Sequence, residues 1–350
     1  MNNRNLTILA AAAVVLLAWA IVQSRLSDRR VVKAAQTGPL LQGLETGDID
    51  RVELGTGEEA VQLKRQGQGF VITSKDDYPA QTKTINELIT NCLDIQTIER
   101  VTDSAANHED LEVTEDKGRQ VVKFFDLDDQ LITGVVVGKY TEQGAGSYVR
   151  LVNSDDVYLT ESSPYIRTGA LDYSETNLVS VDQYKITQVR ITTPGDDFTL
   201  RQEPNDTIVL ALTAAEAVPK LKQTEAQQVY TALSSLYLTD VRKDPAPTEQ
   251  LEFNTTYRCS LQDSTVYILQ VAARDDKYFL KCSALFTDQT PVTMNRNKVE
   301  TEAQLQEKEA KLLAREAALK FAAQHQGWIY EIASWKGENL TKKLSDLIDK

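Results

Sequence analysis

The chain contains little histidine and cysteine, the residues that most often bind zinc or act as acid, base or nucleophile. Its 350 residues include two histidines and three cysteines. Neither His108 nor His325 has a second histidine or a cysteine at the spacing of a metal site. The sequence also lacks a Gly-x-Ser-x-Gly elbow, a phosphate-binding loop, a zincin helix and a dinucleotide fingerprint. It therefore predicts a protein that is not an enzyme, without cofactors and without catalytic, cofactor-binding or metal-binding residues.

The chain also has fewer basic than acidic residues. The chain has 38 lysines and arginines against 51 aspartates and glutamates, which gives a net charge of -13. No basic stripe interleaved with aromatic residues interrupts this acidity, and an acidic surface repels phosphates, so we expect no nucleic-acid partner. The acidic residues gather in three short clusters that could bind a metal, of which the Asp126 cluster lacks the glycine and terminal glutamate of a calcium loop. We therefore interpret that cluster as a solvated hairpin turn. The clusters are Asp126, Asp128 and Asp129; Asp155 and Asp156; and Asp196 and Asp197.

The three cysteines are too few and too far apart for a zinc or redox motif. Cys92 falls on the apolar face of a predicted helix and is expected in a core. Cys259 and Cys282 could pair in an oxidising compartment. If strands 256–261, 265–272 and 277–283 form a meander, however, the two cysteines lie on non-adjacent strands, beyond the roughly 7 Å between Cα atoms that a disulfide tolerates. Two unpaired thiols are the favoured interpretation.

No charged side chain occurs between Arg4 and Arg25. A helix over that stretch, residues 5–24, would be about 30 Å long and would span a bilayer. The favoured prediction is an uncleaved anchor (residues 1–24) followed by a juxtamembrane linker (25–45); the alternative is a signal peptide cleaved after Ala20. Basic residues after the helix would by themselves place the rest of the chain in the cytoplasm, but long domains translocate largely regardless of such charges. We expect a single-pass protein of the inner membrane with its large C-terminal part extracytoplasmic.

The rest of the chain repeats itself at an offset of about 140 residues. Residues 49–54 return as 186–191, and a helix start at Thr84-Ile85-Asn86-Glu87, interpreted as a capping box, returns near Thr224. Both copies alternate short apolar runs around one amphipathic helix, which favours antiparallel sheets with a helix on one face, hence an α+β fold. The predicted repeats cover residues 46–180 and 181–295. The second helix is expected to start near Pro219 or Thr224 and to carry Val229, Tyr230, Leu233 and Leu236.

Residues 296–350 form a third segment of different character. A long helix over 299–325 places Leu305, Leu312 and Leu319 seven residues apart, which could build a coiled coil with a partner but favours packing against its own domain. A protonated His325 would suit the negative end of this helix dipole. A strand at 328–332 and a terminal amphipathic helix marked by Leu340, Leu344, Leu347 and Ile348 are expected to follow.

The order of these patterns resembles a bacterial family catalogued as domain of unknown function 4340. The anchor, residues 49–54, 61–63 and 69–72, and Tyr78-Pro79-Ala80 carry the resemblance, together with 135–139, 147–150 and 178–191. An Asp110-Leu111 pair departs from the Gly-Leu that is usual for the family. The resemblance implies a single-anchor envelope protein that accompanies ABC-type transporter subunits similar to those of gliding-motility systems.

From these observations the leading hypothesis is a non-enzymatic, membrane-anchored accessory or scaffold subunit of an ABC-type transporter complex, with the permease and ATPase as partners. Two alternatives remain open. One is a periplasmic module that binds a ligand or glycan. The other is an envelope glycan hydrolase that would use two facing carboxylates about 5–9.5 Å apart.

Overall fold

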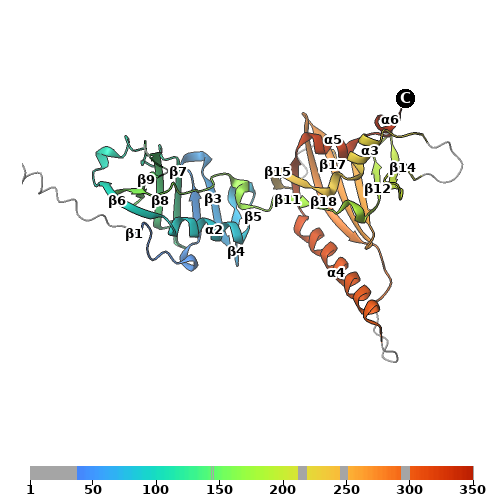
Figure 1. Ribbon diagram of the computed structural model, residues 1–350, viewed down its shortest axis with the longest axis horizontal. Coiled ribbons are helices and arrows are strands. Elements are labelled where there is room, and N and C mark those ends of the chain that lie inside the picture. Colours follow the sequence, from blue (N-terminus) through green and yellow to red (C-terminus); the bar gives the residue numbers. More distant parts are fainter. Residues whose placement is uncertain are drawn as a thin grey trace, which may run out of the picture. The chain divides into compact units, whose positions relative to one another are not determined.

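The computed structural model describes residues 38–142, 144, 146–211, 219–244, 251–292 and 300–349. Contacts within the chain divide them into two units, one with the described residues up to 65 and 85–168, the other with 66–84 and those from 169 on. Each unit contains an antiparallel sheet and at least part of a helix (Figure 1), so the predicted α+β class is confirmed. The repeat boundaries predicted from the sequence, 46–180 and 181–295, remain a prediction. The predicted membrane segment, residues 5–24, lies outside the described residues, and none of the described helices has the length and apolar character to span a bilayer.

The first unit contains an antiparallel sheet whose strands follow the order β1-β6-β10-β9-β8-β7-β2-β3. Their alternating burial follows from period-two apolar patterns, as in β2, where Val52 and Leu54 are buried and the residues between them are not. Helix α2 (Thr82–Leu93) buries Ile85, Leu88 and Ile89, the apolar face predicted from the sequence. The strands are β1 (Gly38–Pro39), β2 (Arg51–Leu54), β3 (Val61–Gln66), β6 (Gln96–Thr102), β7 (Gln120–Phe125), β8 (Leu131–Tyr140), β9 (Ser147–Leu151) and β10 (Val157–Thr160).

The second unit contains a nine-stranded sheet with the order β11-β15-β19-β18-β17-β16-β12-β13-β14. Residues 66–84 add a short strand pair, β4 (Gly69–Ile72) with β5 (Tyr78–Pro79). The helices are α3 (Gln223–Tyr230), α4 (Glu302–His325), α5 (Ser334–Thr341) and α6 (Leu344–Leu347). The strands are β11 (Asn177–Val179), β12 (Ile186–Thr192), β13 (Asp197–Gln202), β14 (Ile208–Leu210), β15 (Leu236–Lys243), β16 (Thr255–Leu261), β17 (Thr265–Arg274), β18 (Lys277–Phe286) and β19 (Trp328–Ile332).

The strands of the two sheets follow the same order, as expected for two copies of one repeated sequence. The series β6-β10-β9-β8-β7-β2-β3 corresponds to β15-β19-β18-β17-β16-β12-β13. In the first unit β10 follows β9 after five residues, whereas in the second unit α4 lies between β18 and β19. The predicted strand at 328–332 is therefore confirmed, and it lies inside the second sheet, between β15 and β18.

Three local predictions are wrong. Helix α2 begins at Thr82, so Thr84 lies inside the helix and does not cap it; its hydroxyl donates to Gln81 Oε1 at 3.3 Å. Helix α3 starts beside Thr224 as predicted but ends at Tyr230, and Leu236 begins β15 instead of continuing the helix. The terminal helix is two short helices, α5 and α6.

Helix α4 packs on β18 through a different face from the one that its leucine spacing favoured. Ala318 and His325 are buried, and the ring of Phe321 lies 5.0 Å from that of Tyr267 on β17. The three leucines of the seven-residue repeat lie to one side of this face and are 46%, 50% and 63% exposed. The helix therefore packs against its own domain as expected, but the leucines of the repeat stay about half exposed beside the contact. These residues are Leu305, Leu312 and Leu319, called the leucine side of α4 below.

Candidate functional site

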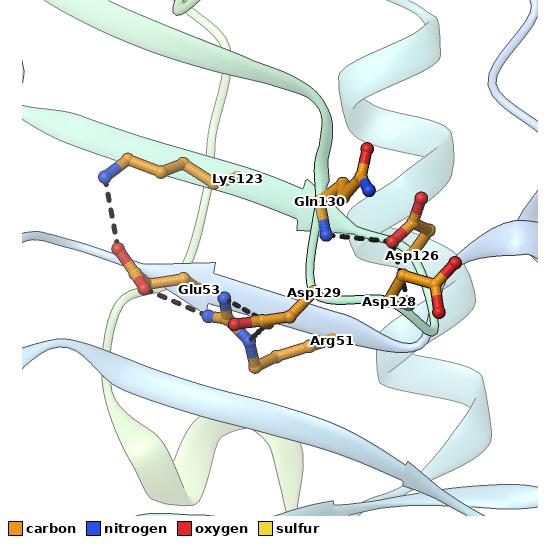
Figure 2. Close-up of polar contacts among 7 residues, drawn as sticks. All are labelled: Arg51, Glu53, Lys123, Asp126, Asp128, Asp129 and Gln130. Carbon is orange, nitrogen blue, oxygen red and sulfur yellow. Dashed lines mark hydrogen bonds and ion pairs between the residues drawn. The ribbon is translucent and has the colours of Figure 1, made fainter.

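The Asp126 cluster forms the turn between β7 and β8, where its carboxylates and backbone close the hairpin (Figure 2). Asp126 Oδ1 accepts the backbone N–H groups of Asp128 at 3.0 Å and Gln130 at 2.8 Å. Asp129 adopts a left-handed backbone with φ of 60° and pairs with Arg51, its Oδ1 2.6 Å from Nη2. A short polar side chain tolerates that conformation, which is why aspartate suits this position.

Arg51 continues this network onto the face of the sheet opposite Val52 and Leu54, where its side chain is 15% exposed. Its guanidinium lies 3.6 Å from the ring centre of Phe125 and 3.1 Å from a carboxylate oxygen of Glu53. Lys123, across the strand pair, lies 3.1 Å from the other oxygen of Glu53 and 2.6 Å from Glu115. Alternating charges on β2 and β7 therefore neutralise each other and fix the register of the two strands.

A cavity of about 530 Å³ lies beside the turn. Asp48, Asp50 and Asp128 contribute carboxylates to its lining, and Arg65 uses its Nε and Nη2 to hold the carbonyls of Ile49 and Thr46, both at 2.8 Å. Within the part of the chain that the structure describes, no three His, Cys, Asp or Glu side chains converge as metal ligands. The cavity sets carboxylates beside apolar side chains such as Leu127 and Ile132, a mixed lining that suits hydrogen bonding to the hydroxyl groups of a ligand.

The other acidic clusters are also engaged in local structure. Asp156 pairs with Arg100 at 2.9 Å across β10 and β6. Asp197 binds Arg190 through both carboxylate oxygens, and this contact lowers the pKa of Asp197. Neither cluster contributes to the lining of the cavity beside the Asp126 turn.

Both histidines are buried. His108 lies in a loop, and its Nε2 donates to the carbonyl of Asp155 at 2.9 Å. His325 is buried beneath Phe321, and its Nδ1 lies 2.7 Å from the hydroxyl of Tyr330 in a hydrogen bond. Burial lowers the pKa of His325 to about 4, so the ring is neutral at pH 7. The expected protonated ring at the helix end is therefore wrong, because desolvation outweighs the favourable field of the helix.

The cysteines are free and buried. Cys259 lies on β16 and Cys282 on β18 with β17 between them, so the predicted separation is confirmed. Burial raises the pKa values of Cys92 and Cys259 to about 12, and that of Cys282 further. Thiols in this state are poor nucleophiles.

A second cavity, of about 540 Å³, lies in the second unit between the end of β18 and α4, and is called the α4 groove below. Its lining is mixed: apolar residues come from the strand, the following loop, and Leu312 and Leu319 of the helix, and polar residues come from the loop and Lys311. Lys311 ties the loop to α4, with Nζ 2.6 Å from both the Asp288 carboxylate and the Thr290 carbonyl. The lining includes Ala284, Leu285, Phe286, Pro291, Val292, Leu312, Arg315, Ala318 and Leu319.

The groove was missed from the sequence because it depends on how far two paired strands overlap. Alternation showed strand β18, and the leucine spacing showed α4, but neither pattern indicates that β19 pairs with only the first half of β18. The one signal in the sequence was Leu285, which falls on the same face of β18 as Lys281 and Ser283, and it is 53% exposed.

A protein-family model described as domain of unknown function (DUF4340) matches residues 71–253 of the chain. No curated protein matches the chain, and no solved structure does.

Proposed function

The chain belongs to the DUF4340 family, and from that premise we propose that it is a non-enzymatic accessory or scaffold subunit of an ABC-type transporter complex. In this proposal residues 5–24 anchor it in the inner membrane, and both units lie outside the cytoplasm. It acts by holding partner proteins, the permease and ATPase assembly, and not by chemistry of its own. The proposal rests on one surface, the leucine side of α4.

The leucine side is suited to binding a protein because it is apolar, rigid and exposed. Leu305, Leu312 and Leu319 follow one side of a helix of 24 residues, beside the face that packs on the sheet. Three leucines at seven-residue spacing lie along one line of the helix, with Glu309 and Glu316 between them, and leucines at this spacing are an arrangement that partner helices and grooves recognise. Such exposed apolar stripes mark interaction surfaces in soluble domains.

The test is purification of the tagged full-length protein from its native membrane in mild detergent, with identification of the copurifying proteins by mass spectrometry. We expect an ABC permease and ATPase in near-stoichiometric amounts. Replacing all three leucines of the leucine side by glutamine should remove them, whereas Leu127→Gln, a leucine 83% exposed in the first unit, should not. Recovery of the protein without transporter subunits refutes the proposal.

A second candidate is a periplasmic ligand- or glycan-binding module, and the cavity beside the Asp126 turn of the first unit supports it. Carboxylates of Asp48, Asp50 and Asp128 line that cavity beside the exposed Leu127. Carboxylates that accept hydroxyl protons next to an apolar side chain resemble the recognition of a sugar ring. Calorimetric titration with envelope glycan fragments tests this candidate, with Asp50→Asn as the variant. If the variant releases the same heat of binding as the unmodified protein, the glycan does not bind in this cavity.

A further inference from the structure

Two rows of opposite charge flank the leucine side of α4. A helix turns about 100° per residue, so the third residue after each leucine lies about 60° to one side of it and the fourth about 40° to the other. After both Leu305 and Leu312 the third residue is basic and the fourth is acidic. The leucine side therefore has a basic flank and an acidic flank. The residues are Lys308 and Glu309 after Leu305, and Arg315 and Glu316 after Leu312.

The charges beside the central leucine are available to a partner. Arg315 and Glu316 are exposed, and the side chain of neither forms an ion pair or a hydrogen bond with another residue that the structure describes. Lys308, by contrast, is paired with Glu300. Residues 302–307, the first turns of the helix, are exposed on every side. The leucine side thus offers one unpaired cation and one unpaired anion, on opposite flanks of its middle leucine.

A second copy of α4 carries the arrangement that this surface requires. When two copies lie side by side and parallel, the two-fold axis between them turns the acidic flank of each toward the basic flank of the other. Arg315 of each copy then meets Glu316 of the other, and each leucine meets its own counterpart. In an antiparallel pair, flanks of like charge would meet instead. The charge pattern therefore favours a parallel pair.

The sheet lies to one side of this surface. Ala318 and His325, which are buried against the sheet, lie about 100–120° around the helix from Leu319, beyond the basic flank. A two-fold axis along the leucine side therefore places the sheets of the two second units on opposite sides of the helix pair. Leu285, 53% exposed, lines the α4 groove together with Arg315 and adds apolar surface beside the basic flank.

We propose that the leucine side of α4 binds α4 of a second copy of this chain, in a parallel pair held by the three leucines and by reciprocal ion pairs between Arg315 and Glu316. Leucines alone would bind many apolar helices, and the two charged flanks make this surface complementary to itself. The inference deepens the proposed function and rests on it for the role of the pair: the scaffold that holds the transporter subunits is two chains.

Two neighbouring leucines test the contact in the full-length protein. Leu312→Gln removes the central leucine of the pair, whereas Leu313→Gln changes a leucine of similar exposure, 58% against 50%, that points about 100° away. Sedimentation analysis of the protein, produced alone and kept in mild detergent, should show a dimer. We expect Leu312→Gln to weaken dimerisation at least about tenfold and Leu313→Gln to leave it unchanged, with the fold of both checked by circular dichroism. A monomer at micromolar concentrations, or an equal response of the two variants, overturns the proposal.

A charge exchange tests the parallel geometry. Arg315→Glu and Glu316→Arg each bring like charges together twice in a parallel pair, so each alone should weaken dimerisation at least about fivefold. In a mixture the two variants should pair with each other, because both contacts then join opposite charges, and two different affinity tags detect this mixed pair. An antiparallel pair predicts no loss in Arg315→Glu, because Lys308 lies opposite. Absence of the mixed pair, or unweakened dimers of Arg315→Glu, overturns the proposal.

The copurification experiment separates this inference from the proposed function. A permease and ATPase that copurify with a monomeric chain overturn the parallel pair alone. A parallel dimer that passes both tests but recovers no transporter subunit overturns the transporter proposal alone.

Discussion

The buried His325 should make the second unit sensitive to acid. Its pKa is about 4 in the folded protein and about 6.5 when exposed. Between these values the unfolded chain binds a proton that the folded chain does not, so the free energy of unfolding falls as pH decreases from 6.5 to 4. Above pH 6.5 the ring is neutral in both states and contributes no pH dependence.

The size of the effect follows from the two pKa values. Proton linkage over this shift removes about 2.5 kcal/mol of stability between pH 7 and pH 4.5. This is a substantial part of the roughly 5–15 kcal/mol that stabilises an ordinary domain. His325→Gln keeps a polar group beside the Tyr330 hydroxyl but has no proton to bind in this range, so its stability should fall by about 2.5 kcal/mol less over the same interval.

Urea unfolding followed by tryptophan fluorescence measures this difference. Both described tryptophans, Trp328 and Trp335, belong to the second unit, and a Trp19→Phe background removes the remaining one. His108→Gln, which changes the other histidine in the first unit, is the matched control. If the unmodified chain and His325→Gln lose the same stability between pH 7 and pH 4.5, His325 is not the buried neutral group that the geometry indicates.

Three further changes test the packing. Gly337→Ala would place a Cβ atom 2.0 Å from Cγ of Tyr278, so we expect a loss of about 1–3 kcal/mol or more in urea unfolding; a neutral result would contradict the contact between α5 and β18. Arg150 donates to four backbone carbonyls in the first unit, and Arg150→Met should leave them unpaired at a cost of about 2–4 kcal/mol, measured as a lower midpoint of thermal unfolding, with the exposed Arg100→Met as the control. The buried thiols should react with an aromatic disulfide reagent at pH 8 only after denaturant is added; prompt modification of the folded protein would show that they are not buried. They are Cys92, Cys259 and Cys282.

Strands whose apolar residues alternate were predictable from the sequence, and long-range partners were not. The meander β16-β17-β18 follows from three such runs with short turns between them, and α2 follows from Ile85, Leu88 and Ile89. Strand β6 was missed because Gln96–Thr102 buries little, so its alternation is weak. Strand β15 alternates clearly, but it follows α3 so closely that Leu236 was assigned to the helix.

The candidate sites divide in the same way. The Asp126 turn was predictable because its composition and its neighbouring strands define a hairpin locally. The α4 groove was not, since it arises from the difference in length between β18 and β19, which are separated by the whole of α4. The leucine spacing of α4 correctly predicted an apolar side of the helix. It did not predict which face packs on the sheet, because that is decided by the ring contacts of Phe321 and His325 with Tyr267 and Tyr330.

The position of β19 governs when the protein can fold during its synthesis. The second sheet cannot join β15 to β18 until residues 328–332 have left the ribosome. The packing of Tyr78 is delayed equally, because its ring lies 4.9 Å from that of Trp328, some 250 residues later in the chain. The first unit has no such requirement, so one half of the protein can form while the other remains an incomplete sheet with exposed edges. Such an intermediate binds chaperones readily and aggregates when it is released early.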